Sequence, residues 1–360
     1  MNPSLAPLPR TTPGRAPSGG FRGACLGVTL GDAAGIGPEV LLQALLHTNL
    51  HERARVEVFV AAELEPWLRA ACDRFQLFST VVAAGCGVVL RPVAAKAAGD
   101  SGGMLRVGEP GRSSPQSREQ AFRALDALAS AALHGEVDVL VTGPSPKGIF
   151  DHMDPRPPGQ TEFLAARLNA PRFAMMLAGP RLRVVPVTTH VPLRAVPDLL
   201  TTKGIVDCGR AAADALVRWL DIGSPRLAVT GLNPHAGEGG RLGDEEARII
   251  APAVEQLQAL GLDVEGPLVA DTVFYRAMTG RFDAVLCMYH DQALGPLKTV
   301  HFHDGFNLTC GLPVPRISPD HGTAYDIAGK GIADPASMVQ TLIWAERMAA
   351  RTRAAGGLRA

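Results

Sequence analysis

Short apolar runs alternate with longer amphipathic stretches along most of the chain. Runs of aliphatic and β-branched residues bounded by turn residues predict buried strands at residues 25–30, 55–62, 87–93, 137–143, 173–179, 182–189, 226–233 and 283–289. Helical periodicity between them predicts helices, most clearly over residues 117–135 and 244–261. Strands that alternate with helices in this way are typical of an α/β protein with a largely parallel sheet.

Composition narrows the class of protein. The chain has 35 Lys and Arg residues against 35 Asp and Glu residues, a balance that argues against a dedicated nucleic-acid-binding protein. No apolar run approaches the roughly 18–20 residues that cross a bilayer, so we expect no membrane partner. The six cysteines form no CxxC pair, a pattern typical of reduced, mostly buried thiols in a cytoplasmic protein.

The ends of the chain differ from its centre. Residues 1–23 contain five prolines, three arginines and no acidic residue, and they lack the continuous apolar segment of a secretory signal. We expect a disordered extension there. Residues 24–351 are expected to form a single catalytic unit and residues 352–360 a short tail.

Three histidines stand where a predicted strand gives way to a loop: His190, His235 and His290. A parallel sheet would bring such positions together, and three imidazoles with an open coordination position suit a catalytic divalent ion. Asp271 and Asp291 could orient these ligands or add an oxygen. Isolated histidines with satisfied hydrogen bonds remain the alternative, because their spacing matches no short-range metal motif.

Two further segments carry groups that bind anions. Residues 31–40, GDAAGIGPEV, follow a predicted strand and open a helix whose N-terminal amides favour an anion, although they match neither GxGxxG nor a Walker motif. Lys298 and Arg316 flank a segment that holds Asn307, and such side chains bind phosphates or carboxylates through charge-assisted hydrogen bonds. Lys147, at the end of TGPSPK, is more simply interpreted as a solvated lysine.

Residues 320–335, DHGTAYDIAGKGIADP, resemble the adenosine-binding loop of the isocitrate and isopropylmalate dehydrogenase superfamily. That loop carries HG(S/T)A followed by a selectivity position, which corresponds to Asp326 here. A carboxylate at this position accepts hydrogen bonds from ribose hydroxyls and repels a 2′-phosphate, so the resemblance implies NAD rather than NADP. A glycine-rich turn before a helix is the alternative. The four residues matched to HG(S/T)A are His321, Gly322, Thr323 and Ala324.

Several long motifs occur together in one order: GDAAGIGPE, VTTHVPLRAVP, GLNPHAGEGGRLGDEE, MYHDQALGPLK and DHGTAYDIAGKG. With them the chain resembles the 4-hydroxythreonine-4-phosphate dehydrogenase family of pyridoxal phosphate biosynthesis, from about Cys25 to about Arg351. The resemblance implies an isocitrate/isopropylmalate dehydrogenase-like α/β fold of two lobes with an active-site cleft between them. It also implies a homodimer whose metal site, holding zinc, magnesium or cobalt, draws ligands from both subunits.

The resemblance assigns roles to individual residues. Its metal ligands are His190, His235 and His290, which we expect, with Asp271, to be catalytic. Its substrate contacts are Thr161, Lys298, Asn307 and Arg316. The implied reaction is NAD-dependent oxidation of the C3 hydroxyl of 4-phosphooxy-L-threonine, followed by loss of CO₂ to give 3-amino-2-oxopropyl phosphate.

Some positions depart from the family pattern. Gln160 replaces a substrate-contacting histidine, Pro146 replaces an asparagine and Ala33 stands where proline is common. Gln160 can still hydrogen-bond substrate, but it carries neither a proton nor a charge. A relative that oxidises a four-carbon sugar-acid phosphate, such as threonate or erythronate 4-phosphate, is therefore the second interpretation. A phosphate acyltransferase of the same architecture and a non-catalytic binding protein are the alternatives from other classes.

Overall fold

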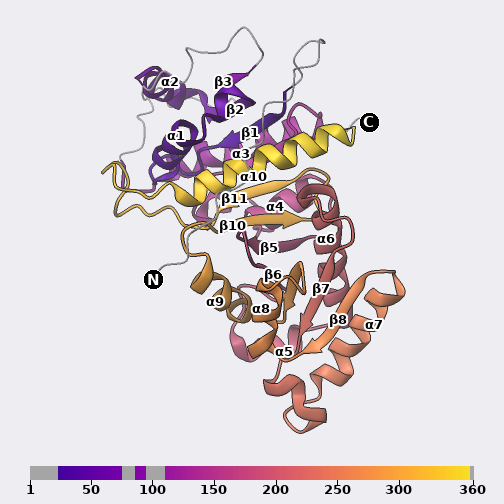
Figure 1. Ribbon diagram of the computed structural model, residues 1–360. Coiled ribbons are helices and arrows are strands. Elements are labelled where there is room, and N and C mark those ends of the chain that lie inside the picture. The colour runs from indigo at the N-terminus through magenta and orange to yellow at the C-terminus, as the bar shows by residue number, and fades with distance from the viewer. Residues whose placement is uncertain (1–22, 75–85, 95–109, 357–360) are drawn as a thin grey trace, which may run out of the picture.

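The computed structural model describes residues 23–74, 86–94 and 110–356. The expected N-terminal extension, apart from Gly23, and the last four residues of the expected tail lie outside these ranges. Within them, eleven strands form one sheet in the order β3-β2-β1-β4-β11-β10-β5-β6-β9-β7-β8, which runs through both lobes (Figure 1). The strands that the sequence predicts are β1 (Cys25–Thr29), β2 (Arg55–Ala61), β3 (Gly87–Val93), β4 (Val139–Thr142), β5 (Ala174–Ala178), β6 (Arg183–Pro186), β7 (Arg226–Thr230) and β9 (Ala284–Cys287). The others are β8 (Asp263–Leu268), β10 (Phe306–Cys310) and β11 (Arg316–Pro319).

Two parallel blocks of strands flank an antiparallel centre. β3, β2, β1, β4 and β11 are parallel in the upper lobe of Figure 1, and β6, β9, β7 and β8 are parallel in the lower lobe. Between them, β10 pairs antiparallel with β11 and β5, and β5 pairs antiparallel with β6. The predicted α/β class with a largely parallel sheet is confirmed. However, the carboxyl ends of the two blocks point to opposite edges of the sheet.

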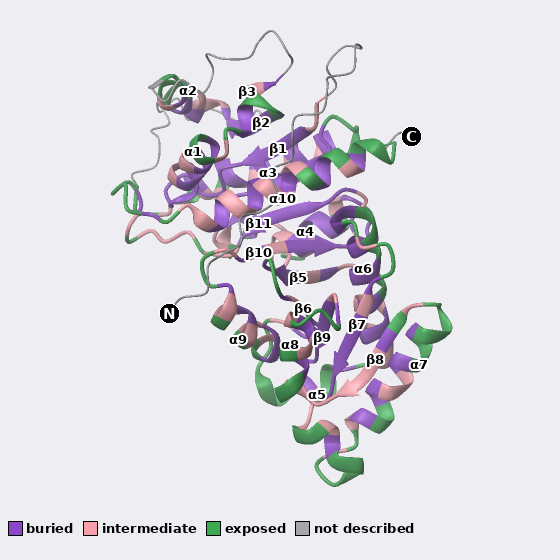
Figure 2. Ribbon diagram, in the orientation of Figure 1, coloured by how far each residue is buried: buried purple, intermediate pink, exposed green. Residues whose placement is uncertain are grey.

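Helices cover both faces of this sheet. In Figure 2 the central strands are largely buried, the edge strands β3 and β8 are only partly buried, and most exposed residues lie on outward helix faces and loops. The helices of the upper lobe and centre are α1 (Gly37–Thr48), α2 (Glu65–Arg74), α3 (Pro115–Leu133), α4 (Gln160–Arg167), α6 (Thr202–Leu220) and α10 (Ala336–Ala354). Those of the lower lobe are α5 (Val196–Leu199), α7 (Ala251–Ala259), α8 (Ala270–Met278) and α9 (His290–Val300). None of the helices in the described ranges is long and apolar enough to cross a membrane.

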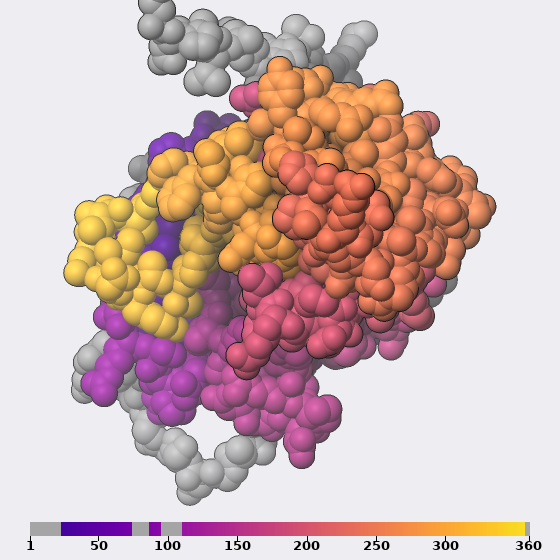
Figure 3. Space-filling view, turned by 90° about the horizontal axis from the view of Figure 1, so that it is seen from below, coloured from indigo at the N-terminus to yellow at the C-terminus, as the bar shows by residue number. Residues whose placement is uncertain are grey.

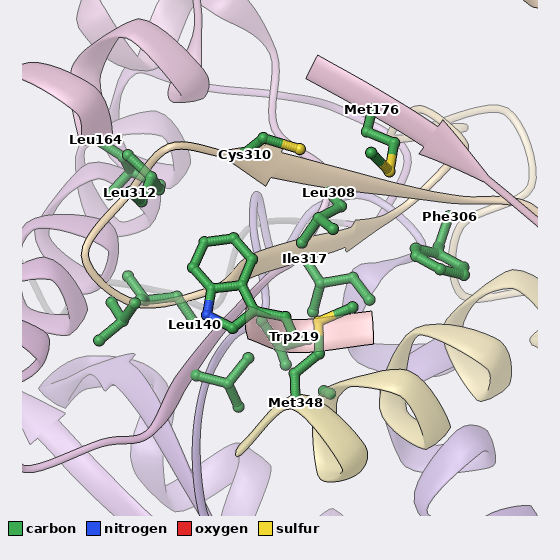
Figure 4. Packing of buried hydrophobic residues seen from close by; sticks show 14 of the residues in the cluster. Leu140, Leu164, Met176, Trp219, Phe306, Leu308, Cys310, Leu312, Ile317 and Met348 are labelled. Carbon is green, nitrogen blue, oxygen red and sulfur yellow. The ribbon is translucent and has the colours of Figure 1, made fainter. Parts of the chain in front are cut away.

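The main core lies between the antiparallel centre and two long helices. Met176, Leu308 and Ile317 come from β5, β10 and β11, and they cluster with Trp219 of α6 and Met348 of α10 (Figure 4). All five side chains are fully buried. Because side chains alternate along a strand, the residues between these core positions face the opposite side of the sheet. On that side, Leu177 of β5 packs in a second cluster with residues of α9.

The structure departs from the predicted elements at a few places. The helix predicted over residues 244–261 begins as a π-helical turn, Glu246–Ile250, and continues as α7. β8 was not predicted because Gly266 and Pro267 are turn-forming residues that rarely lie inside a strand. α1 begins with Pro38 in its first turn, as predicted. α10 continues to Ala354, past the expected start of the tail.

Candidate active site

A cavity of about 470 Å³ lies on the face of the sheet opposite the main core. Its floor uses the alternate positions of the central strands, namely Met175 and Leu177 of β5, Asn307 of β10, and Arg316 and Ser318 of β11. The loop after β4, the start of α4, the first turn of α9 and the loop after β11 form its walls. The antiparallel centre therefore provides a platform on which loops from both lobes converge.

Arg316 is a buried cation in this floor, with an exposed fraction of 4%. Its Nε donates to Thr142 Oγ1 at 2.9 Å, and its Nη1 donates to Thr309 Oγ1 at 3.2 Å. Its Nη2 donates to Gln160 Oε1 at 2.8 Å. These partners are neutral oxygens, and of the five N–H donors of a guanidinium two are left for another acceptor. A buried cation whose direct partners are neutral is ready to bind an anion.

Burial lowers the pKa of Arg316 to about 10, and the nearby carboxylate of Glu162 opposes this shift. The guanidinium therefore remains protonated at neutral pH. Since Glu162 also lines the cavity, the site has one acidic group beside its cation. Arg316 is thus the buried positive charge of the cavity floor, and the exposed Lys147 lies in the wall.

Gln160, the first residue of α4, fixes the orientation of Arg316. Its Oε1 accepts from the guanidinium, while its Nε2 donates to Gly143 O at 3.2 Å and Ser145 Oγ at 3.1 Å. A neutral imidazole has one donor and one acceptor, so a histidine here could not make all three contacts. Thr161, next along α4, is buried in the cavity wall.

His190 and His290 both line this cavity. They follow the parallel neighbours β6 and β9, and their ring centroids are 5.7 Å apart. Partial burial lowers the pKa of His190, and the charges of Lys147 and His290 add to this effect. His290 Nδ1 lies 2.7 Å from Asp291 Oδ1, which leaves Nε2 for a metal. A neutral imidazole and a carboxylate-oriented imidazole are suitable ligands for a divalent ion.

His235 does not line this cavity. His235 follows β7 in the segment Pro234–Gly240, where its side chain is exposed. Asp271 is also exposed, and it lies on α8, a helix that contacts the same segment. Within one chain, no group of three or more His, Cys, Asp or Glu side chains in the described ranges is arranged to hold a metal ion. The structure therefore unites two of the three predicted metal ligands, and the third lies apart with Asp271.

The conformation around His235 is unusual and is held by Glu246. His235, Ala236 and Glu238 have positive φ angles of 52°, 52° and 44°. Glu246 Oε1 accepts hydrogen bonds from Leu232 N and Asn233 N, both at 2.8 Å. Burial alone would raise the pKa of Glu246, but the hydrogen bonds from Asn233 and Leu232 outweigh it and lower this pKa. This carboxylate was not among the predicted site residues, and its place in GLNPHAGEGGRLGDEE was the one signal for it in the sequence.

Lys298 approaches the cavity only through Asp320. Its Nζ lies 2.5 Å from Asp320 Oδ2 and donates to Asp320 O at 3.0 Å. Asp320 itself lines the cavity, as do the next two residues, His321 and Gly322. His321 Nε2 and Asn307 Oδ1 are buried there without a hydrogen-bond partner. Such orphaned polar atoms in a cavity wall are ready for a ligand.

The loop after β11 leaves the cavity and lies against the segment that joins β1 to α1. Ile36 N donates to Thr323 O at 2.9 Å, so this amide at the start of α1 already has a partner within the protein. Ala324 has a positive φ of 41°, and Asp326 is exposed. One of the amides that could favour an anion at residues 31–40 therefore takes part in a contact between two loops. Lys147, expected to be a solvated lysine, is exposed but lines the cavity.

Comparisons with known proteins identify the family of the chain. The family described as "Pyridoxal phosphate biosynthetic protein PdxA" matches residues 65–345. The chain is 44% identical to a 4-hydroxythreonine-4-phosphate dehydrogenase of Erythrobacter litoralis, with 91% of this chain and 97% of the relative covered. It is 40% identical to a D-threonate 4-phosphate dehydrogenase of Cupriavidus necator, with 91% and 97% covered. A solved 4-hydroxythreonine-4-phosphate dehydrogenase from Klebsiella pneumoniae superposes with a TM-score of 0.74 at 36% identity, over 91% of this chain and 99% of that chain.

The fold and these relatives define a dehydrogenase with the two-lobed α/β fold that the sequence predicted. Within that class, the chain belongs to the PdxA family.

Proposed function

We propose that this chain oxidises the C3 hydroxyl of 4-phosphooxy-L-threonine with NAD⁺ and a divalent metal ion, and that the product then loses CO₂ to give 3-amino-2-oxopropyl phosphate. The observation that carries this proposal is the cationic Arg316, buried in the cavity floor with neutral partners and near two histidines. A substrate with a phosphate at one end and a hydroxy acid at the other suits a cavity with a cation and a metal-binding pair.

The residues of the cavity hold the substrate in one orientation. Arg316 binds the phosphate through its two remaining N–H groups, and Gln160 keeps the guanidinium plane fixed. The buried Asn307 Oδ1 accepts a hydrogen bond from the hydroxyl or ammonium group of the substrate. Thr161, at the start of α4, provides a further hydroxyl in the wall. These contacts place the hydroxyl-bearing carbon of the substrate toward His190 and His290.

The family implies a metal ion and a nicotinamide cofactor, and the residues present fit both. His190 and His290 would hold the ion with His235 of a second copy of the chain, while His321, Gly322, Thr323, Ala324 and Asp326 would hold NAD. When bound, the ion supplies Lewis-acid stabilisation of negative charge on oxygen, and NAD⁺ accepts the hydride from C3. The exposed carboxylate of Asp326 favours the free ribose hydroxyls of NAD over a 2′-phosphate.

A homodimer would complete this site. His235 and Asp271 are exposed on the lower lobe, away from the cavity of their own chain, and that lobe faces the viewer in Figure 3. Beside His190, Val191 and Leu193 expose 37% and 66% of their surface. Apolar side chains exposed next to an incomplete polar site support burial against a second copy. All six cysteines are free thiols, which supports a cytoplasmic location.

The test of this function is NADH formation, followed by absorbance, with purified metal-loaded protein. We expect rapid turnover of 4-phosphooxy-L-threonine and slower turnover of D-threonate and erythronate 4-phosphates. The C. necator relative supports the sugar-acid phosphate as the second candidate. If only a sugar-acid phosphate is turned over, the proposed NAD-dependent oxidation stands, but the substrate is the sugar-acid phosphate and not 4-phosphooxy-L-threonine. No NADH with any of the three would contradict the proposed function.

Gln160→His is expected to lower kcat/KM for 4-phosphooxy-L-threonine by about fivefold, the cost of one hydrogen bond of roughly 1 kcal/mol. Histidine keeps only two of the three contacts that orient Arg316. Steady-state NADH kinetics measure the effect, and Gln258→His, at a position outside the cavity, is the matched control. A severalfold increase instead would show that Gln160 is adapted to a different substrate.

A further inference from the structure

Residues 31–40 and residues 320–335 form one hydrogen-bonded unit. Asp32, which is completely buried, lies at its centre. Its Oδ2 accepts from the hydroxyl of Tyr325 at 2.8 Å, from Ser113 Oγ at 2.9 Å and from Ser117 Oγ at 3.2 Å. Its Oδ1 accepts from Ala34 N at 3.0 Å. Tyr325 thereby ties the loop after β11 to the loop after β1 and to the first turn of α3.

The backbone reinforces this contact. Ile36 N donates to Thr323 O at 2.9 Å, one residue before the positive φ of Ala324. At Gly35 an added Cβ would lie 2.6 Å from Thr323 O, so only glycine allows the two loops to approach this closely. Residues almost 300 positions earlier in the chain therefore restrain the conformation of the loop with the HGTA motif.

Glu39 holds the far end of the same loop. From the first turn of α1, its Oε1 accepts from Ala333 N at 3.2 Å and its Oε2 from Gly329 N at 3.3 Å. The loop is otherwise rich in glycine and turn conformations, with positive φ at Gly329 and Gly331. Two carboxylates on one side therefore restrain a segment whose own backbone hydrogen bonds include the turn contacts donated by Ile327, Ala328 and Lys330.

Burying a carboxylate whose partners are hydroxyl groups and one amide costs free energy, because no cation compensates the loss of water. Asp32 is nevertheless completely buried, and its carboxylate holds the hydroxyl of Tyr325 in place. Neither Asp32 nor Glu39 lines the cavity. Their contacts instead determine the conformation of the residues between His321 and Ala333.

We propose that Asp32 and Glu39 are positioning residues for the cofactor: they hold the loop after β11 in its dinucleotide-binding conformation and so set the affinity for NAD⁺ without touching it. This inference rests on the proposed function, which gives that loop to NAD. If the restraints are removed, the loop samples other conformations, and the apparent Kd rises by the inverse of the competent fraction.

The test uses the full-length protein without substrate and measures the Kd for NAD⁺ by isothermal titration calorimetry. Tyr325→Phe and Asp32→Asn are each expected to raise this Kd by about tenfold, the result of a competent fraction near one tenth. Because both remove the same link, the double variant should bind NAD⁺ about as weakly as either single variant. Glu39→Gln, which retains one of two acceptors, should show a smaller rise. Tyr275→Phe, at a tyrosine that is 69% exposed, is the control.

Two further readouts separate positioning from general destabilisation. Amide hydrogen exchange of the unliganded protein should accelerate in residues 321–333 and stay unchanged in β5 and β6. At saturating NAD⁺, kcat should remain within about twofold of the wild-type value, so that the defect is confined to the KM for NAD⁺. Wild-type Kd values in all variants, or additive effects in the double variant, would overturn the inference while leaving the proposed function intact. A wild-type protein that binds no NAD⁺ would overturn both.

Discussion

Replacing Arg316 with methionine is expected to lower kcat/KM for the phosphorylated substrate by about 30-fold to several thousandfold, mainly through KM. Removing one partner of a buried, hydrogen-bonded charge pair typically costs about 2–5 kcal/mol, which corresponds to this range. Arg316 is the buried cation of the cavity floor, and methionine has a similar length without the charge. Arg316→Lys keeps the positive charge but loses the planar guanidinium that can donate two parallel hydrogen bonds, so we expect an intermediate loss of kcat/KM.

Steady-state NADH kinetics measure this effect, with thermal melting to verify folding. Arg183→Met is the matched control, because burial also lowers the pKa of Arg183 but its side chain donates to Asp283 O outside the cavity. The Arg183→Met variant should leave the KM for the phosphorylated substrate unchanged. A normal KM in Arg316→Met, together with unaltered competition by inorganic phosphate, would show that the phosphate binds elsewhere.

The strands that sequence patterning predicted are those with a continuous, mainly apolar run of residues. β1, β4 and β9 lie in the parallel blocks and are buried along their full length. β10 and β11 were not predicted, because FNLTC and RISP place polar residues on alternate positions. Of those polar residues, Asn307, Arg316 and Ser318 lie in the floor of the cavity. The functional face of the sheet is therefore the part that an apolar-run criterion overlooks, whereas strict alternation in FNLTC was an available signal.

The site itself was predictable by residue type and less so by position. Arg316 and Asn307 were chosen for anion-binding chemistry, and both line one cavity. The placement of His190 and His290 followed from strands that end beside each other. The link from Asp32 to Tyr325 spans the chain, and no local pattern reports such a contact. His235 shows another limit: its strand end was predicted correctly, but one chain does not bring it to the cavity.

If the metal ligands come from two chains, two inactive variants should restore each other. His190→Ala and His235→Ala are each expected to lower kcat by about a thousandfold, since a catalytic ion contributes several kcal/mol. In a hybrid dimer, one site carries both substitutions and the other carries neither, because His190 and His290 share a cavity that His235 of the same chain does not line. The hybrid should regain about half of the wild-type activity and one metal ion per dimer.

Hybrids are obtained by coexpressing the two variants with different affinity tags and purifying over both. NADH absorbance gives the activity, and mass spectrometric metal analysis gives the occupancy. The control pairs His190→Ala with His290→Ala: both residues belong to the cavity of one chain, so every site of this hybrid lacks a ligand and stays inactive. Equal restoration in both pairs, or in neither, would contradict a site shared in this way. Restoration only with His235→Ala would assign that histidine to the partner's cavity and explain its exposure in a single chain.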